Sequence, residues 1–257
     1  MTGATGLVAA TISVTFTTRR RDAGHRALRD VDLRVGTGEI VGLVGESGSG
    51  KSTLGRVIVG LQERYAGTVS FEGQTLSHRR TKAQRRAIQM VFQDPYASLD
   101  PQMTIWQMLE ELLIVHQIGT TREARRQRCQ DLMQLVHMPA SLLDARPSGM
   151  SGGQRQRMAI ARALAVGPRL LVADEATSAL DVSVQAGIIN LFADLRDRIG
   201  LSILFISHNL AVVRSLCDRV AVIYQGEIVE MAETQAIFAN PQHGYTRQLL
   251  AAAPDLP

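Results

Sequence analysis

The chain has 257 residues, of which 45% are hydrophobic and 20% are charged, and its formal net charge is +4. It can bury a substantial core, so one elaborated α/β domain is favoured over two independent ones. No apolar run approaches the roughly 18 residues that cross a bilayer, and no basic-then-apolar leader opens the chain; we therefore expect neither a membrane-spanning helix nor a signal peptide, and a location in the cytosol.

Cysteine and arginine usage excludes further classes. Cys129 and Cys217 are isolated, without C-x-x-C spacing, and are interpreted as reduced thiols instead of a metal site or a disulfide. The arginines are dispersed along the chain, which favours solvated faces, with attraction to anionic lipid headgroups as a further hypothesis. We expect no nucleic-acid partner.

The N-terminal residues 1–36 are predicted to hold an edge sheet. Val8–Phe16 and Val31–Val35 alternate apolar and polar residues, as half-buried strands do.

A strand, a glycine-rich loop and a helix follow. Ile40–Val44 is typical of a strand buried on both faces, and a helix is predicted from Ser52 to Leu61, closing near Gly60. The loop between them fits G-x-x-x-x-G-K-[ST], in which glycines let backbone N–H groups turn inward around phosphate. It consists of Gly45, Glu46, Ser47, Gly48, Ser49, Gly50, Lys51, Ser52 and Thr53. The alternative, a glycine-rich turn without a ligand, is disfavoured by the full pattern and its flanks.

Two side chains of this loop predict a nucleotide with Mg²⁺. Lys51 can reach the β and γ oxygens, and the Ser52 hydroxyl can ligate Mg²⁺, next to the positive end of the helix. Only Lys51 and Lys82 are lysines among the 28 basic residues, so a compact ammonium is retained here.

A helical insertion separates the loop from the next motif. Gly67–Phe71 and Ile88–Phe92 are predicted strands, and the insertion between Asp94 and about Gly149 includes helices over Ile105–His116 and Arg122–Val136.

Residues 150–154, Met-Ser-Gly-Gly-Gln, close the insertion. Ser151 is a natural N-cap for a helix over about 152–166, which leaves a hydroxyl and free N–H groups at a positive helix end. This indicates either a second anion site, made of Ser151, Gly152, Gly153 and Gln154, or an ordinary helix-start turn. The chain by itself offers no reason for two phosphate sites.

Two later strands end in polar side chains. Leu170–Glu175 is predicted as a buried strand that ends in two acids, which suits Asp174 to the Mg²⁺ shell and Glu175 to polarising the attacking water. Acids that merely end a strand in solvent are the alternative. Ser202–Ile206 is followed by His208, which is either a satisfied loop residue or a γ-phosphate contact in the crevice that parallel strands share.

The order of these segments resembles the nucleotide-binding subunit of ATP-binding cassette (ABC) transporters over nearly the whole chain. Residues 45–52 match the Walker A motif, Gln93 the Q-loop, 150–154 the signature usually written LSGGQ, 170–175 Walker B, 178–181 the D-loop and His208 the H-loop. The resemblance implies Glu175 as the catalytic carboxylate, His208 as the γ-phosphate contact and Gln93 as the link from the Mg²⁺ and water site to the membrane partner. It also implies Asp181 as a contact across a dimer and an aromatic stacked on adenine, for which Phe16 is the candidate; plain packing of Phe16 is the alternative.

The implied assembly is a head-to-tail dimer in which each signature completes the phosphate loop of the facing subunit. It implies ATP and Mg²⁺ as cofactors, two integral-membrane permease subunits, a second ATPase subunit, and indirectly an extracytoplasmic substrate-binding protein. A similar but different ATPase chain is favoured over a second copy. The location implied is peripheral, on the cytoplasmic face of the inner membrane.

The chain departs from the family at Met150, where Leu is usual, and lacks the acid common just ahead of the signature. Because Met and Leu have similar volumes, we expect the site to work, with reduced turnover as the alternative.

The implied fold is an α/β P-loop NTPase (RecA-like) core with an antiparallel β subdomain and an inserted α-helical subdomain. We expect one nucleotide-binding domain over residues 1–257. Its core is assigned to 1–93 and 158–230, its helical subdomain to 94–157 and its C-terminal helical tail to 231–257.

The sequence of the tail indicates which subfamily of ABC transporters the chain resembles. Residues 240–250 resemble the P-x-H-x-Y-T-x-x-L-L tail of the ATPase subunits of dipeptide, oligopeptide and nickel importers, and residues 92–101 match that subfamily too. Physically the tail predicts an amphipathic helix started near Pro241, with Tyr245, Leu249 and Leu250 packed. We expect an ATPase that drives uptake of di- or oligopeptides or nickel-type cargo. A soluble ABC ATPase of translation or DNA repair is the alternative, although such proteins commonly fuse two cassettes or insert long coiled coils.

Overall fold

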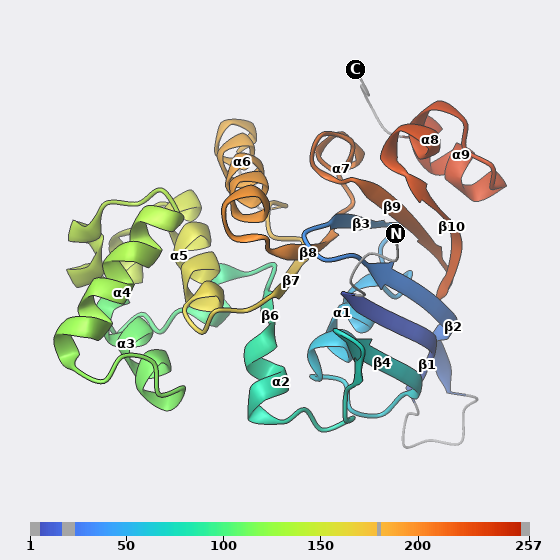
Figure 1. The fold of residues 1–257 in the computed structure, drawn as a ribbon. Helices are drawn as coiled ribbons and strands as arrows, with labels where there is room; N and C mark the ends of the chain where they lie inside the picture. Colours follow the sequence, from blue (N-terminus) through green and yellow to red (C-terminus); the bar gives the residue numbers. More distant parts are fainter. Residues whose placement is uncertain (1–5, 17–23, 179–180, 253–257) are drawn as a thin grey trace.

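A six-stranded sheet lies at the centre of the computed structural model, which describes residues 6–16, 24–178 and 181–252 (Figure 1). Its strand order is β10-β9-β3-β8-β7-β6, and only β10 runs antiparallel to its neighbour. The strands are β3 (Ile40–Val44), β6 (Ile88–Val91), β7 (Leu170–Asp174), β8 (Ser202–Ile206), β9 (Arg219–Tyr224) and β10 (Glu227–Glu233). Every residue of β3, β7 and β8 is buried, as predicted for strands covered on both faces. The parallel strands therefore direct their carboxyl ends to one edge, where the predicted motifs follow.

The N-terminal strands belong to a second, antiparallel sheet of order β2-β1-β4-β5. It contains β1 (Leu7–Phe16), β2 (His25–Val35), β4 (Ala66–Phe71) and β5 (Gln74–Thr75). The two strands predicted within residues 1–36 are present. They pair with each other, and β1 also pairs with the later β4; β2 begins six residues before the alternating stretch that predicted it.

Helix α1 (Lys51–Val59) lies between the two sheets and contacts strands of both. It ends at Gly60, whose φ of 83° is left-handed, as predicted for a helix that closes there. Alternate residues of β3 face two different cores: Val41 and Leu43 pack with α1 and the second sheet, whereas Ile40 and Val44 face the opposite side. Helices α6 (Val182–Ile199) and α7 (Leu210–Leu216) pack on that opposite side.

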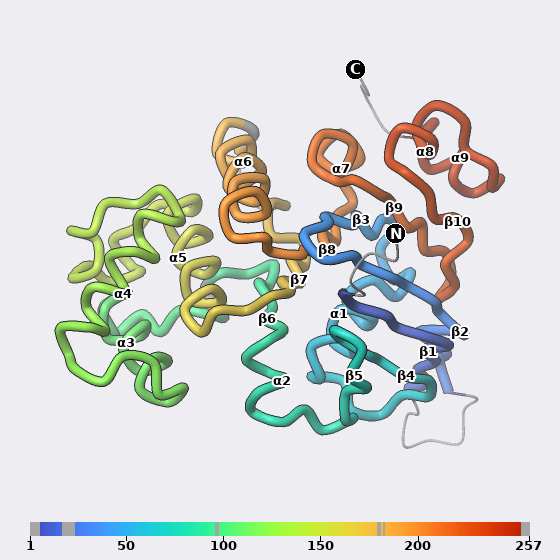
Figure 2. Tube along the Cα trace, viewed as in Figure 1, coloured from blue at the N-terminus to red at the C-terminus, as the bar shows by residue number. Residues whose placement is uncertain are grey.

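A helical segment leaves the sheet after β6 and returns before β7 (Figure 2). The short helix α2 (Lys82–Ala87) precedes β6, and the segment itself contains η1 (Pro95–Ser98), α3 (Ile105–Val115), α4 (Arg122–Leu135), η2 (Ala140–Asp144), η3 (Pro147–Gly149) and α5 (Gly152–Leu164). The predicted helices over Ile105–His116 and Arg122–Val136 each end one residue earlier, and α5 ends at Leu164 instead of Val166.

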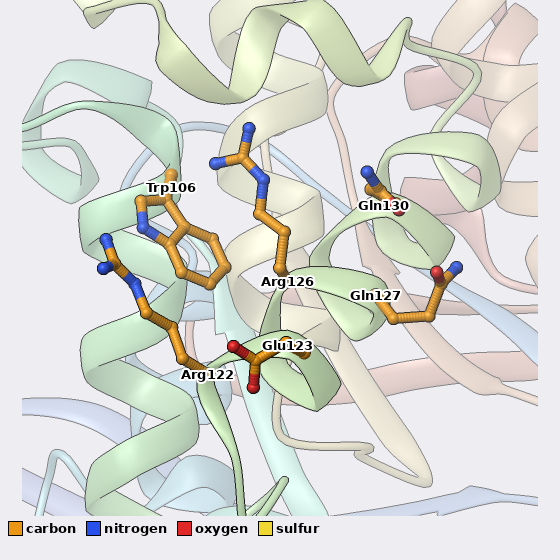
Figure 3. Close-up of a pocket in the computed structure, with 6 residues that line it drawn as sticks. All are labelled: Trp106, Arg122, Glu123, Arg126, Gln127 and Gln130. Carbon is orange, nitrogen blue, oxygen red and sulfur yellow. The ribbon is translucent and has the colours of Figure 1, made fainter.

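A cavity of about 420 Å³ lies within this helical segment, beside Trp106 and Arg126 (Figure 3). The Arg126 guanidinium donates to both carboxylate oxygens of Asp144 at 3.0 and 2.9 Å and lies 4.9 Å from the centre of the Trp106 ring. Because this arginine already has a bidentate partner, it serves to join α3, α4 and η2.

The chain ends in two helices, α8 (Thr234–Ala239) and α9 (Gly244–Ala251), on the outer flank of β9 and β10 (Figure 1). The predicted tail helix begins at Gly244, not near Pro241. The amides of Gln242 and His243 instead donate to the Glu230 carboxylate at 2.8 and 2.9 Å, which keeps these two residues outside the helix. Tyr245 is buried, and Leu249 and Leu250 pack against the core, as predicted. Among the described residues, no helix combines the length and apolar character needed to traverse a lipid bilayer.

Candidate nucleotide-binding site

The glycine-rich loop joins β3 to α1 and adopts a backbone that side chains would disrupt. At Gly45, with φ of 156°, an added Cβ would lie 2.1 Å from the carbonyl oxygen of Ile223. At Gly50, with φ of 109°, it would lie 2.6 Å from the carbonyl oxygen of Ala27. The loop therefore needs glycine at both positions, because the backbone is left-handed there and other strands approach closely.

Lys51, the first residue of α1, folds its ammonium back over the loop. Its Nζ donates to the carbonyl oxygens of Gly45 and Glu46, each at 2.7 Å. The residue is only 5% exposed, and burial lowers the pKa of its ammonium, against the opposing pull of Glu175, Asp174 and Glu46. A partly buried cation aimed along the loop can neutralise phosphate charge.

Ser52 and Asp174 join the loop to the end of β7. The Ser52 hydroxyl donates to the Asp174 carboxylate at 2.9 Å. Asp174 is 6% exposed, and burial raises the pKa of its carboxyl, partly opposed by the Ser52 hydrogen bond and by Arg56. One hydroxyl beside one buried carboxylate suits Mg²⁺, which takes few protein ligands and completes its shell with water and phosphate. No group of three or more His, Cys, Asp or Glu able to hold a metal occurs in the described parts of the chain.

Glu175 follows β7 in a strained conformation. Its φ of 49° is left-handed for a residue with a side chain, and its amide donates to Ile206 at the end of β8 at 3.0 Å. The Ser178 amide and hydroxyl both donate to the Glu175 carbonyl, at 3.1 and 3.0 Å. These contacts turn the carboxylate out of the sheet, to where His208 Nδ1 lies 3.6 Å from Glu175 Oε1. Gln93 Nε2 in turn donates to the Ser178 hydroxyl at 3.5 Å.

A cavity of about 440 Å³ brings these elements together. Its lining combines the phosphate loop with two predicted polar residues and three residues of the antiparallel sheet: Phe16, His25, Ala27, Ser47, Gly48, Gly50, Lys51, Ser52, Thr53, Gln93 and Glu175. Phe16 is 44% exposed at the end of β1 and is thus available to a planar ligand. His25 pairs directly with Phe16 across the β1–β2 ladder and was not predicted. A second strand predicted to begin at His25, opposite Phe16, would have indicated this histidine.

The signature residues 150–154 lie away from the residues that line the phosphate-loop cavity. Ser151 caps α5 through a reciprocal pair with Gln154, in which the Ser151 hydroxyl accepts from the Gln154 amide at 3.3 Å and the Ser151 amide donates to Gln154 Oε1 at 2.9 Å. Among the described residues, those that line the phosphate-loop cavity include none from 150–154. Met150 is 5% exposed and packs in the core, so its departure from Leu concerns packing.

The D-loop is described in part. Ala179 and Leu180 lie outside the described residues, whereas Ser178 contacts Glu175 and Gln93 as above. Asp181 is the exposed N-cap residue of α6, and its side chain makes no capping hydrogen bond. Asp181 and Ser151 are therefore both exposed residues at the start of a helix.

Comparison with known proteins decides the family. The profile of the ABC transporter family matches residues 28–178, which extend from β2 through the phosphate loop, Walker B and Glu175. The chain belongs to the ABC transporter family. A peptide import ATP-binding protein of Brucella ovis is 50% identical over 237 residues, covering 91% of this chain and 74% of that protein. A second protein so named, from Brucella abortus, is 48% identical over 242 residues, covering 91% and 72%.

Solved structures of ABC proteins share the fold. The ATP-binding cassette MJ0796, solved as a dimer in a post-hydrolysis state bound to ADP and Pi, has a TM-score of 0.77 at 28% identity and covers 89% of this chain and 98% of that one. CbiO1 from Clostridium perfringens has a TM-score of 0.80 at 24% identity, with 92% of each chain covered. The predictions of an ABC ATPase and of its fold are confirmed: the chain is an ATPase that binds ATP.

Proposed function

We propose that this ATPase drives uptake of small peptides through separate membrane subunits, from the cytoplasmic face of the membrane. The main observation behind this proposal is the convergence of five side chains at one sheet edge, beside a nucleotide-sized cavity. They are Lys51, Ser52, Asp174, Glu175 and His208. The peptide cargo is supported by the names of the Brucella relatives and by the tail over residues 240–250. Nickel-type cargo is the second possibility that the tail leaves open.

The loop amides and Lys51 would hold the phosphates, and Phe16 would stack on adenine. Ser52 and Asp174, with Gln93 nearby, would hold Mg²⁺, which neutralises charge on the β- and γ-phosphates when bound. Glu175 accepts a proton from the attacking water as the water oxygen bonds to the γ-phosphorus. The bond from that phosphorus to the β–γ bridging oxygen then breaks, and ADP leaves with the electron pair. His208, which lies beside Glu175, would donate to a γ-phosphate oxygen.

The composite site would be completed by another subunit. The start of α5 offers a hydroxyl and free amides, and the phosphate-loop cavity of the same chain does not use them. We infer that Ser151, Gly152, Gly153 and Gln154 serve the nucleotide of the facing subunit, with Asp181 at the shared interface. The dimeric state of the related cassette supports this arrangement. A similar but different ATPase chain is the partner that we propose.

The permease subunits would dock where the helical segment leaves the sheet. A cavity of about 630 Å³ lies there, between η1 and α3, with a mixed lining: Ser98, Leu99, Asp100, Pro101, Met103, Met108, Glu111, Leu112, Val115 and Arg162. Gln93 stands at the entry to this segment and Ser151 at its exit, so a tilt of the segment would couple both to the membrane partner. We retain the division into a core (1–93 and 158–230), a helical subdomain (94–157) and a tail (231–257).

The catalytic role of Glu175 is tested with Glu175→Gln. We expect ATP binding to persist, turnover to fall at least about 100-fold because the base is lost, and dimer to accumulate. Glu63→Gln, at an exposed carboxylate after α1, is the matched control and should hydrolyse ATP normally. Normal turnover in Glu175→Gln would remove Glu175 from this role.

The transport function is tested by reconstitution of this chain with the two permease subunits that it assembles with. We expect ATPase activity to rise when a binding protein loaded with a di- or oligopeptide is added to the complex. Stimulation by nickel-loaded binding protein alone would reassign the cargo. Stimulation by ribosomes or DNA, with none by a binding protein, would overturn transport.

A further inference from the structure

The C-terminal helix α9 reaches the phosphate loop through one side chain. The Tyr245 hydroxyl accepts a hydrogen bond from the backbone amide of Glu46 at 3.0 Å, across 199 positions of the sequence. Tyr245 is only 7% exposed, and its ring lies 4.1 Å from that of Tyr224 at the end of β9. A buried ring packed against a second ring fixes the position of its hydroxyl, so the bond constrains the loop.

The same region of β9 holds the loop at two further points. The Gly226 amide donates to the Ser49 carbonyl at 3.0 Å, and the Ile223 carbonyl lies against Gly45. The loop is thus held along its length by the β9–β10 turn and by α9. Of these contacts, only the one to Glu46 depends on the tail.

Helix α9 is itself anchored before it reaches Tyr245. Glu230 on β10 accepts from the amides of Gln242 and His243, and His243 Nδ1 accepts from the Tyr245 amide at 3.2 Å. This chain of contacts runs from β10 through the helix start to the loop. It gives the tail a defined position from which to act on the nucleotide site.

We propose that α9 positions the phosphate loop for nucleoside triphosphate, with Tyr245 as the positioning residue. The inference deepens the proposed function and rests on it for the identity of the ligand. Because Tyr245 occupies the Glu46 amide, that amide is turned away from the phosphates, and the inward amides of the following residues are fixed in place. Coupling between two sites is reciprocal, so nucleotide binding must also strengthen the docking of α9.

The test compares Tyr245→Phe with wild type and with Tyr65→Phe, a control at a half-buried tyrosine outside the loop and tail. The phenylalanine retains the contact between the two rings and removes only the hydroxyl. We expect faster hydrogen exchange at the Glu46 amide and a Kd for MgATP about 3- to 10-fold weaker, with kcat at saturating ATP within twofold of wild type. Tyr65→Phe should change none of these.

A second measurement uses the unmodified chain, in case the variant folds poorly. We expect MgATP to slow hydrogen exchange across residues 244–251. Unchanged α9 exchange with saturating MgATP would overturn the proposal, as would unchanged Glu46 exchange and ATP affinity in folded Tyr245→Phe. Lys51→Ala separates the two ideas: if it binds MgATP as tightly as wild type, the proposed nucleotide site itself is wrong.

Discussion

At the scale of single residues, Asp174 carries a conflict between stability and function. Burial raises the pKa of its carboxyl above the ordinary value of 3.8, so the ionised side chain destabilises the nucleotide-free fold at neutral pH. The unfavourable contribution is absent below the unfolded pKa, where folded and unfolded chains are both protonated. It develops as the pH rises through the folded pKa. A divalent cation beside Asp174 would reverse it.

We therefore predict that Asp174→Asn stabilises the nucleotide-free chain while abolishing Mg²⁺-dependent turnover. The asparagine oxygen can still accept from Ser52, and removing the buried charge should raise Tm at pH 7 by about 2–4 °C, the shift that about 1 kcal/mol produces in a chain of this size. Thermal unfolding without nucleotide, from pH 7 down to pH 3.5, measures this difference. It should shrink as the pH falls. Asp131→Asn, at an exposed carboxylate, is the control; a lower Tm for Asp174→Asn at pH 7 would contradict the argument.

Also at the scale of residues, some parts of the site could be predicted from the sequence and others could not. Lys51, Ser52, Asp174 and Glu175 lie within local patterns whose chemistry is legible in order along the chain. Tyr245 was predicted only as a packed residue of the tail, because its bond to Glu46 joins positions 199 apart. No local pattern encodes a contact that depends on where β9 and β10 place the tail.

At the scale of elements, buried strands were predicted best and the ends of helices less well. Ile40–Val44 and Ser202–Ile206 were predicted with their observed bounds, because both runs are apolar, have the length of a strand and contain β-branched residues, which together favour a buried strand over a helix. The start of α9 was misplaced by three residues, because Glu230, on a distant strand, takes the amides that would otherwise begin the helix. Tertiary hydrogen bonds of this kind override local helix signals.

The packing of α5 against α6 yields a prediction at this scale. A Cβ added at Gly153 would lie 2.4 Å from Val184 Cγ1, and a β-branched valine cannot swing aside cheaply. We predict that Gly153→Ala destabilises the fold by about 1–3 kcal/mol despite the better helix propensity of alanine. Denaturant unfolding measures the loss. Gly149→Ala, which meets open space, is the control and should leave stability near wild type.

Val184→Ala completes a double-mutant cycle. It removes the methyl that the new Cβ meets, so the double variant should recover at least about 0.5 kcal/mol relative to the sum of the single changes. Strict additivity would place the cost of Gly153→Ala elsewhere than in the α5–α6 contact.

At the scale of the whole molecule, one chain holds the loop, the acids and the histidine together but turns its signature away from them. The proposed head-to-tail dimer would bring the signature of one subunit to the loop of the other, so that each of the two sites would draw on both chains. Damage to the loop of one chain and to the signature of the other therefore leaves one site intact. Recovery of activity in such a mixture therefore distinguishes sites that two chains share from sites that each chain completes by itself.

We predict that, in dimers of this chain with itself, Lys51→Ala and Ser151→Ala chains, each nearly inactive alone, regain turnover when mixed at concentrations that support such dimers. In a 1:1 mixture about half of the dimers are mixed, each with one intact site, so the rate should approach about a quarter of wild type if the sites act independently. Steady-state phosphate release across mixing ratios measures the recovery, which should vanish on dilution. A mixture of Lys51→Ala with Lys51→Ala,Ser151→Ala chains is the control and should stay inactive, because neither chain offers a working loop. Absence of recovery at any ratio, with both variants folded and dimeric, would mean that Ser151 serves its own chain or no nucleotide at all.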